Sequence, residues 1–272
     1  MADQLVRVAL SIAGSDSGGG AGIQADLKAF ARCGVHGTTA ITALTAQNTL
    51  GVDMVRTVDP EMIVAQVRTV VRDIGVDAVK VGMLADEATI GAVVEALGLV
   101  GDAPVVVDPV MVAESGSVLL DPDAKAALIE RILPLATVVT PNLLEARQLS
   151  GRGESATPEE MAEAIHALGP DAVIVTGGHT EEGDDLLFES SGSIRISGPR
   201  YPSDAAHGSG CTHSSVLAAC LAQGAEMAEA ARWAREIAAD AVGNGLSSIG
   251  GGPGPVDAIG ILRRASRDRP DD

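Results

Sequence analysis

The sequence alternates between short apolar runs rich in valine and isoleucine and longer stretches rich in alanine. The apolar runs fall at residues 6–13, 38–44, 78–84, 105–108, 137–140 and 172–176. Strands buried on both faces read as continuous apolar runs, and parallel strands need crossovers, usually helical, between them. The alternation therefore predicts an α/β fold, in which helices cover both faces of a mostly parallel sheet. Helices are expected at residues 21–33, 158–169, 211–221 and 227–242, and in the remaining intervals.

Two local signals refine this pattern. Thr157, Pro158 and Glu160 form a capping-box start with proline at the first helical position. After Gly178 the sequence turns to short alternating segments at 186–189 and 194–197, which predict an antiparallel hairpin region. We find no internal repeat and no long linker, so residues 1–272 are expected to form one domain with a frayed tail at 267–272.

The charge of the chain excludes several classes of partner. Asp and Glu number 37 against 19 Lys and Arg, for a formal net charge of -18 at pH 7. A negative field repels nucleic acid and anionic lipid. The rings of two phenylalanines, one tyrosine and one tryptophan are too few to stack bases along a single strand. We therefore expect no nucleic-acid partner.

The cysteines and the N-terminus bear on location. Cys33, Cys211 and Cys220 are an odd number without zinc-like pair spacing, which predicts a reducing compartment. The first residues show neither a signal peptide nor an apolar stretch long enough to span a membrane. A cytoplasmic location without a membrane partner is expected.

Two glycine-rich strings each precede a predicted helix. They read GSDSGGGAG at residues 14–22 and HGSGCT at residues 207–212. Such turns expose backbone amides and the positive end of a helix dipole to an anion, although either string alone could equally be a tight turn. Neither contains the lysine of a P-loop, and no acid ends the second strand as a dinucleotide fingerprint requires. An NAD-dependent dehydrogenase is therefore disfavoured.

Cys211 falls in the first turn of the helix after the second glycine string. At that place the dipole and free amides are expected to lower the pKa of the thiol, which could then act as nucleophile or base. The alternative is a small buried apolar residue, and we adopt that interpretation for Cys33 and Cys220.

Polar side chains lie at or near the ends of several predicted strands. Asp108 ends one strand, and Asn142 with Glu145 follows the next. Ligands of open α/β sheets bind at this edge, and oxygen groups of this kind suit Mg²⁺, although Asp108 alone could be a helix cap. Lys80 could simply pair with one of these acids. The Gln47 amide, which donates and accepts at once, matches an aminopyrimidine edge.

These features in this order resemble the hydroxymethylpyrimidine/phosphomethylpyrimidine kinases of thiamine biosynthesis, within the ribokinase-like superfamily. The matching strings are IAGSDSGGGAGIQADLK at 12–28, ITALTAQNT at 41–49, KVGML at 80–84, VDPVM at 107–111, TPNLLEA at 140–146 and HGSGCT at 207–212. The resemblance implies a ribokinase-like three-layer sandwich. It also implies phosphorylation by ATP and Mg²⁺ of the small molecule 4-amino-5-hydroxymethyl-2-methylpyrimidine, then of its monophosphate. A homodimer would be in keeping with the family.

The resemblance assigns roles to residues of this chain. The expected pyrimidine contacts are Gln47, Gly14, Asp26, Met83 and Val110. The expected contacts to ATP and its phosphates are Asn142, Thr176, Gly178 and His207, and the expected metal ligands are Asp108 and Glu145. Cys211 falls on the position proposed as the base for the substrate hydroxyl, and the amides of Gly208, Ser209 and Gly210 would hold the moving phosphoryl group.

The chain departs from the family pattern in three places, one of which is the segment 203–206, where the family's usual Asn-Thr pair is missing. The family places a lysine that touches ATP phosphates where this chain has Thr176, which removes a cation from an acidic protein. His179, His207 or an arginine could replace it. His213 occupies a position that is usually apolar. Nucleotide contacts are therefore less firmly predicted than pyrimidine contacts.

Three other functions stay open at this point. The nearest is a pyridoxal kinase of the same superfamily. A thiol hydrolase would use Cys211 with His207 or His213, but would leave Asp108, Asn142 and Glu145 without a role. The third is a pyrimidine-binding module without catalysis, which the loss of the lysine at Thr176 suggests.

Overall fold

The computed structural model describes residues 6–112, 116–177, 183–201, 203 and 205–261. Within them the strands form one sheet in the order β3-β2-β1-β4-β5-β6-β7-β8-β9. The parallel strands are β1 (Val8–Asp16), β2 (His36–Gln47), β4 (Ala78–Val81), β5 (Val105–Val107), β6 (Val138–Val139) and β7 (Ala172–Val175). The antiparallel strands are β3 (Val52–Thr57), β8 (Asp185–Glu189) and β9 (Gly192–Ile196). The mostly parallel sheet and its hairpin region are confirmed.

The central strands bury both of their faces. In β5, Val105 and Val107 belong to one hydrophobic cluster and Val106 to the other. In β7, Val173 and Ile174 are divided in the same way. Successive strand side chains point to opposite faces, so a strand covered on both sides must be apolar throughout. This is the physical origin of the valine runs in the sequence.

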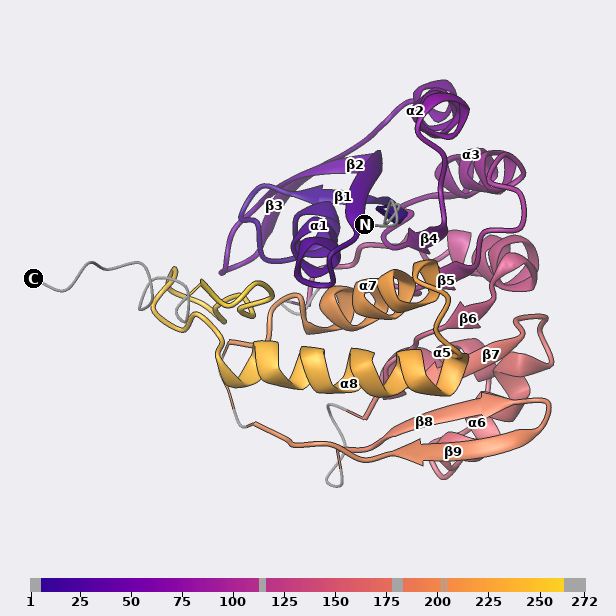
Figure 1. Cartoon of the computed structure of the whole chain (residues 1–272), viewed down its shortest axis with the longest axis vertical. Helices are drawn as coiled ribbons and strands as arrows, with labels where there is room; N and C mark the ends of the chain where they lie inside the picture. The colour runs from indigo at the N-terminus through magenta and orange to yellow at the C-terminus, as the bar shows by residue number, and fades with distance from the viewer. Residues whose placement is uncertain (1–5, 113–115, 178–182, 202, 204, 262–272) are drawn as a thin grey trace, which may run out of the picture.

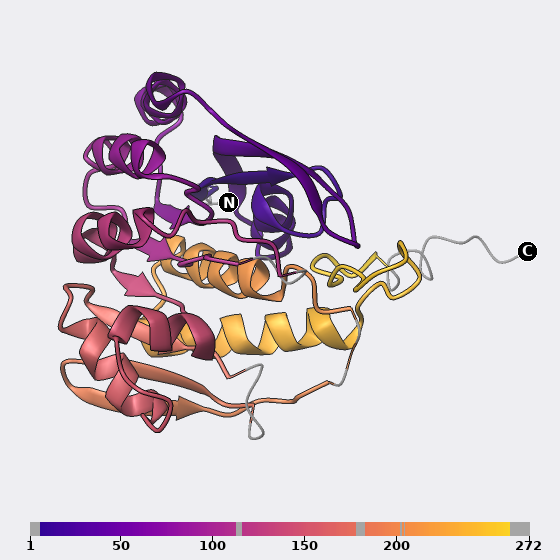
Figure 2. The same ribbon diagram turned by 180° about the vertical axis from the view of Figure 1, so that it is seen from behind.

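Helices cover the two faces as separate layers (Figure 1). One layer holds α2 (Pro60–Asp73), α3 (Glu87–Leu97), α4 (Ala124–Ala127), α5 (Leu143–Ser150) and α6 (Pro158–His166), and Figure 2 brings it to the front. The opposite layer holds α1 (Gly22–Arg32), α7 (Ser209–Ala222) and α8 (Met227–Gly243). Between α4 and β6 the chain forms two further helical turns, η1 (Leu128–Ile132) and η2 (Leu133–Leu135). The predicted three-layer sandwich is confirmed.

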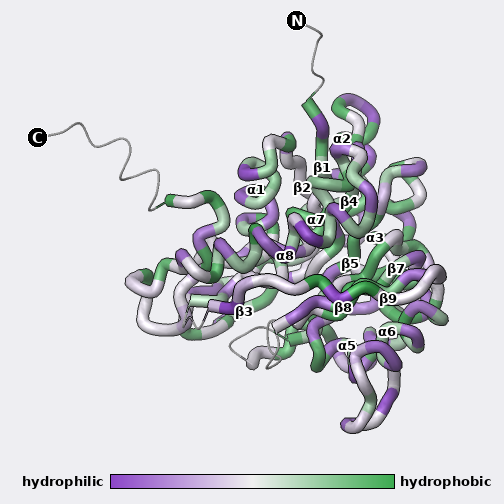
Figure 3. Tube along the Cα trace, turned by 60° about the horizontal axis from the view of Figure 1, so that its bottom comes forward, coloured by the Kyte–Doolittle hydropathy of each residue, from purple (hydrophilic) through white to green (hydrophobic). Residues whose placement is uncertain are grey.

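The amphipathic helices and their caps follow the local sequence. Along α2, hydrophilic and hydrophobic residues alternate in Figure 3, as expected for a helix buried on one side. Thr157 and Glu160 form the predicted capping box at the start of α6. That helix ends at His166, three residues before the expected Gly169, because the amides of Leu168 and Gly169 bond to carbonyls three residues back, as in a tighter turn.

The sequence pattern missed β3. Five of its six residues are exposed, so this edge strand lacks the apolar signature of its neighbours. The expected frayed tail at 267–272 lies outside the described residues. In the described part of the chain, no helix is long and apolar enough to cross a membrane.

Candidate active site

The two glycine-rich strings meet at the carboxyl edge of the parallel strands. Gly208 has a left-handed φ of 84°, and a Cβ there would collide with the carbonyl oxygen of Gly20. A Cβ on Gly20 would in turn collide with the ring of His207. Only glycine allows so close an approach of two backbones. The two strings, which are far apart in the sequence, are thus in close contact at the N-terminus of α7.

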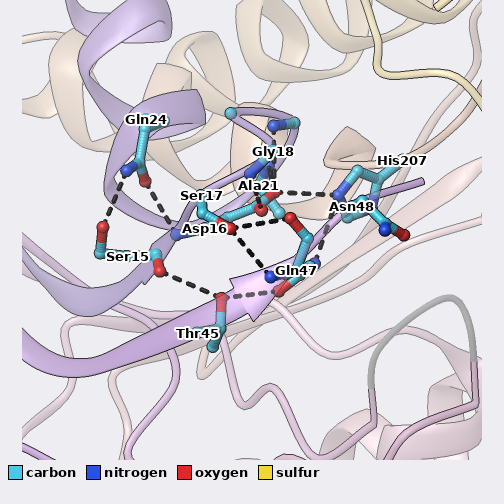
Figure 4. Close-up of polar contacts among 12 residues, drawn as sticks. Ser15, Asp16, Ser17, Gly18, Ala21, Gln24, Thr45, Gln47, Asn48 and His207 are labelled. Atoms are coloured by element: carbon cyan, nitrogen blue, oxygen red, sulfur yellow. Dashed lines mark hydrogen bonds and ion pairs between the residues drawn. The ribbon is translucent and has the colours of Figure 1, made fainter. Parts of the chain in front are cut away.

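The first glycine string binds a carboxylate of its own chain. Asp16 accepts hydrogen bonds from the amides of Gly18 (2.8 Å), Gly20 (3.0 Å) and Ala21 (2.9 Å). Its Oδ2 also lies 3.1 Å from Nε2 of His207 (Figure 4). Burial opposes ionisation of Asp16, but the His207 contact and the amides outweigh it, so the pKa of this carboxyl is lowered. The amides expected to face an external anion are therefore largely engaged by Asp16.

The second string begins α7. Gly208 is the N-cap, and Ser209 and Gly210 occupy the first turn, where backbone amides point out of the helix. The amide of Ser209 donates to the carbonyl of Ala206 at 2.9 Å. Of the three amides expected to hold a phosphoryl group, that of Ser209 therefore already has an acceptor in this conformation.

Gln47 ends β2 beside the glycine strings and lines a pocket of about 260 Å³. The other lining residues are Asn48, Thr49, Leu50, His207, Gly252 and Pro253. Ser17 holds the main chain of Gln47, because its hydroxyl donates to the Gln47 carbonyl and accepts from the Gln47 amide, each at 2.8 Å. His207, expected at the ATP phosphates, lies 3.5 Å from the Gln47 side chain.

The other expected pyrimidine contacts take different positions. Gly14 and Met83 are neighbours, since a Cβ on Gly14 would lie 3.0 Å from the Met83 sulfur. Val110 is half-buried just after β5. Asp26 is fully buried on α1, beneath the surface formed by the glycine strings. The structure brings the first three to the sheet edge and places the Asp26 carboxylate in the interior.

A buried ionic cluster lies between the sheet and α7. Lys80 and Asp26 are both fully buried, with 3.0 Å between Nζ and Oδ1. Ser11 and Ser215 donate to the two oxygens of Asp26 at 2.6 and 2.7 Å. Lys80 also lies 3.6 Å from Asp108, so the simpler interpretation of this lysine, pairing with a sheet-end acid, is confirmed. Burial lowers the pKa of Lys80, but the nearby carboxylates outweigh it and the net shift is upward.

The two expected metal ligands are both buried, and the charge of one affects the ionisation of the other. Burial raises the pKa of Asp108, and burial with the charge of Asp108 raises the pKa of Glu145 to about 8. Glu145 also accepts from the amide of Asn142 at 2.9 Å, and Asn142 caps α5 in return. Among the described residues no cluster of three or more metal-ligating side chains occurs. Two carboxylates still fit Mg²⁺, which takes its remaining ligands from water and phosphates.

The pKa of Cys211 is shifted in the direction opposite to the one expected from its helix position. Burial raises it, the charge of Lys80 lowers it, and Asp108 and Asp26 raise it again, with a net value of about 12. The prediction of a lowered pKa is therefore wrong for the ligand-free chain. Desolvation and two carboxylates outweigh the dipole of one helix turn.

The ends of β6 and β7 carry the expected nucleotide contacts. Asn142 and Thr176 lie side by side in a parallel bridge. Gly178 and His179 lie outside the described residues. Gly177 is the last described residue before them, and its amide donates a hydrogen bond to Asp185 at 2.8 Å.

His213, at the position that departs from the family, lies 2.9 Å from Asp185 and is buried with it. Arg235 approaches the same carboxylate at 3.8 Å. Both histidines proposed as partners of Cys211 are thus held by carboxylates, His207 by Asp16 and His213 by Asp185. A carboxylate also orients the histidine of a catalytic triad, so it is the raised pKa of the Cys211 thiol, rather than these contacts, that disfavours the thiol hydrolase.

Sequence reasoning missed several residues of this region. They are Ser11, Asp16, Thr45, Asp185, Ser214 and Ser215. Two signals were available. An aspartate just before glycines is typical of a side chain that binds nearby backbone amides. Two adjacent serines directly before the apolar, alanine-rich second half of a helix indicate buried polar partners.

Comparison with known proteins agrees with the resemblance found in the sequence. A hydroxymethylpyrimidine/phosphomethylpyrimidine kinase of Rhizobium meliloti (strain 1021) is 49% identical over 259 residues, which cover 93% of this chain and 97% of that protein. The ADP complex of Bacillus subtilis pyridoxal kinase has a TM-score of 0.84 at 38% identity, and covers 94% of this chain and 100% of that chain. The structure of phosphomethylpyrimidine kinase from Clostridium difficile 630 has a TM-score of 0.75 at 40% identity, and the match covers 84% of this chain and 96% of that chain.

The family model described as phosphomethylpyrimidine kinase matches residues 16–257, from the first glycine string to the loop after α8. The span holds the first string from Asp16 onward, the whole second string, the Gln47 pocket and Cys211, with Asp26, Lys80 and Asp108 of the buried cluster. The chain belongs to the phosphomethylpyrimidine kinase family.

Proposed function

We propose that the chain uses Mg²⁺ and ATP to phosphorylate the hydroxymethyl group of 4-amino-5-hydroxymethyl-2-methylpyrimidine, and then the resulting monophosphate. One observation carries this proposal: the two glycine strings meet so that the N-terminus of α7 lies next to the Gln47 pocket. An acceptor ring held by Gln47 would then lie beside amides that can stabilise charge on a phosphoryl group. ATP as the donor is supported by solved relatives bound to ADP and AMP-PCP.

The residues divide into a pyrimidine side and a nucleotide side. Gln47, with Gly14, Met83 and Val110, would hold the ring. Asp26, which is buried, would keep Lys80 and Ser215 in place and would not touch the ring. Asn142, Thr176 and Gly178 remain predicted contacts to ATP, and the amides of Gly208, Ser209 and Gly210 remain predicted contacts to the transferred group.

Asp108 and Glu145 would hold Mg²⁺, whose chemistry is to neutralise phosphate charge during transfer. Cys211 would then accept the proton of the substrate hydroxyl. In the ligand-free chain its raised pKa keeps the thiol protonated. We therefore confine the base role to the assembled complex, where charge on Asp108 is offset. Activity should be negligible after chelation with EDTA and return on adding Mg²⁺.

Product mass spectrometry tests the proposal. The protein is incubated with Mg²⁺, ATP and the hydroxymethylpyrimidine, and in parallel with pyridoxal. Two added phosphates on the pyrimidine support the proposed function. Preferred turnover of pyridoxal supports the alternative, which the similarity to pyridoxal kinases keeps open. Binding without ATP consumption would indicate a non-catalytic module. Near-normal turnover of Cys211→Ala would contradict the base role alone.

Three expectations remain predictions: a single domain, a homodimer and a cytoplasmic location. One continuous sheet through the described residues supports the first. Sedimentation velocity would test the second.

A further inference from the structure

The side-chain amide of Gln47 lies between Thr45 on the same strand and His207 next to the N-terminus of α7 (Figure 4). Its Oε1 is 3.0 Å from the Thr45 hydroxyl, and its Nε2 is 3.5 Å from Nε2 of His207. The oxygen and nitrogen of an amide have nearly the same size and shape. The hydrogen-bond network therefore decides which end is which.

Asp16 decides where the proton of His207 lies. Its carboxylate accepts from three backbone amides, those of Gly18, Gly20 and Ala21. A carboxylate with three such donors is ionised and has no proton to give. The 3.1 Å contact between Asp16 Oδ2 and His207 Nε2 therefore requires a proton on that nitrogen, whether the imidazole is neutral or charged.

Two conflicts follow for the Gln47 amide. An amide nitrogen facing the protonated Nε2 of His207 places a donor against a donor. The hydroxyl of Thr45 has one proton but two acceptors, the carbonyl of Ser15 at 3.1 Å and Gln47 Oε1 at 3.0 Å. Exchanging the two ends of the amide removes the contact between two donors and leaves the Thr45 proton to Ser15 alone. The amide oxygen then shares the His207 N–H with the nearer Asp16 carboxylate, and the amide nitrogen donates to Thr45, which donates to Ser15.

We propose that Asp16, His207 and Thr45 hold the Gln47 amide with its oxygen toward His207 and its nitrogen toward Thr45, and that this orientation selects a 4-amino over a 4-oxo pyrimidine. This inference rests on the proposed function. In that orientation the oxygen keeps one lone pair and the nitrogen one N–H for a ligand. An amino group and the adjacent ring nitrogen are complementary to that pair.

A 4-oxo pyrimidine presents the reverse pattern, an oxygen and a ring N–H. The hydroxymethyl group sets the position of the ring. The ligand oxygen would then face the Gln47 oxygen and the ring N–H would face the Gln47 N–H, so that neither pair could form a hydrogen bond. His207 is in this view a positioning residue for ring recognition. It lines the same pocket as Gln47.

Isothermal titration without ATP tests the inference. Dissociation constants are measured for 5-hydroxymethyl-2-methylpyrimidines with a 4-amino or a 4-oxo group. The wild-type chain should prefer the amino ligand by at least ~100-fold. Thr45→Val and His207→Phe keep the side-chain shape but remove the groups that orient the amide, and each should reduce that ratio by about tenfold or more.

Ser17→Ala is the matched control. The Ser17 hydroxyl binds the main chain of Gln47, through both its carbonyl and its amide. This variant should weaken the binding of both ligands to the same extent and leave the ratio of their dissociation constants unchanged. If His207→Phe fails to fold by circular dichroism, Thr45→Val carries the test alone, because it lies outside the ion pair with Asp16.

The outcomes separate this inference from the proposed function. An unchanged ratio in the folded variants, with a wild-type chain that phosphorylates the amino ligand, overturns the amide orientation only. A wild-type chain that binds both ligands equally has the same consequence. A wild-type chain that neither binds nor phosphorylates the amino ligand overturns both proposals.

Discussion

Cys211 should behave as an unreactive thiol in the ligand-free protein, despite its place in the first turn of α7. Burial, with Asp108 and Asp26 acting against Lys80, raises the pKa of the thiol from 9.0 to about 12. Each pKa unit changes the ratio of thiolate to thiol tenfold, so about one Cys211 thiol in 10⁵ is ionised at pH 7. An ordinary cysteine has a few per cent of thiolate at that pH, roughly a thousandfold more.

Alkylation with iodoacetamide measures this difference. The ligand-free chain is labelled between pH 7 and pH 10, and the peptide that contains Cys211 is quantified by mass spectrometry. The labelling rate should rise about tenfold per pH unit and still be rising at pH 10. The control is the same chain in guanidinium, where Cys211 should titrate with an inflection near pH 8.5.

The inflection, rather than the rate, decides the outcome. Restricted access to a half-buried thiol slows labelling at every pH without moving the inflection. An inflection at or below pH 8 in the folded chain would show a stabilised thiolate. That result would refute the dominance of burial over the helix dipole, and would revive a cysteine nucleophile.

Three further predictions concern the packing around the site. Gly208→Ala should lower the free energy of unfolding by more than ~1–2 kcal/mol in urea titrations, because its φ is left-handed and its Cβ meets Gly20; turnover should fall by about 100-fold. Lys80→Met should cost about 3–5 kcal/mol by the same assay, since it leaves Asp26 buried without a cation, and adding Asp26→Leu should recover part of the loss. Asp16→Asn should destabilise the chain at neutral pH. Folding lowers the pKa of Asp16 from 3.8, so the stabilisation by its carboxylate is present above that pH and is lost as the pH falls below it. The urea midpoints of variant and wild type should therefore converge in acid.

The fold was largely predictable because its signals are local. Strands buried on both faces must be apolar along their whole length, which located β1, β2, β4, β5, β6 and β7. The capping box at Thr157 and the hairpin after Gly178 depend on neighbours a few residues away. The edge strand β3 was missed for the same reason, since an exposed strand has no apolar period to detect.

The site was predictable in its members more than in its contacts. The sequence singled out both glycine strings, Gln47, Lys80, Asp108 and Cys211, and all of them lie at or just below the carboxyl edge of the sheet. It could not show that Asp16 occupies the amides of the first string, or that His207 lies beside Gln47. These pairs join residues far apart in the chain, and no spacing rule relates them.

The sequence by itself determined the α/β layering, the two turns that only glycine allows and the residue types available for phosphoryl transfer. Tertiary structure alone decided the charge states. Lys80 is separated from Asp26 by 54 residues and His207 from Asp16 by 191, yet each pair is in contact. Local patterns depend on backbone geometry, which neighbours along the chain control. The ionisation of a side chain depends on water exclusion and nearby charge, and these exist only once distant segments have packed together.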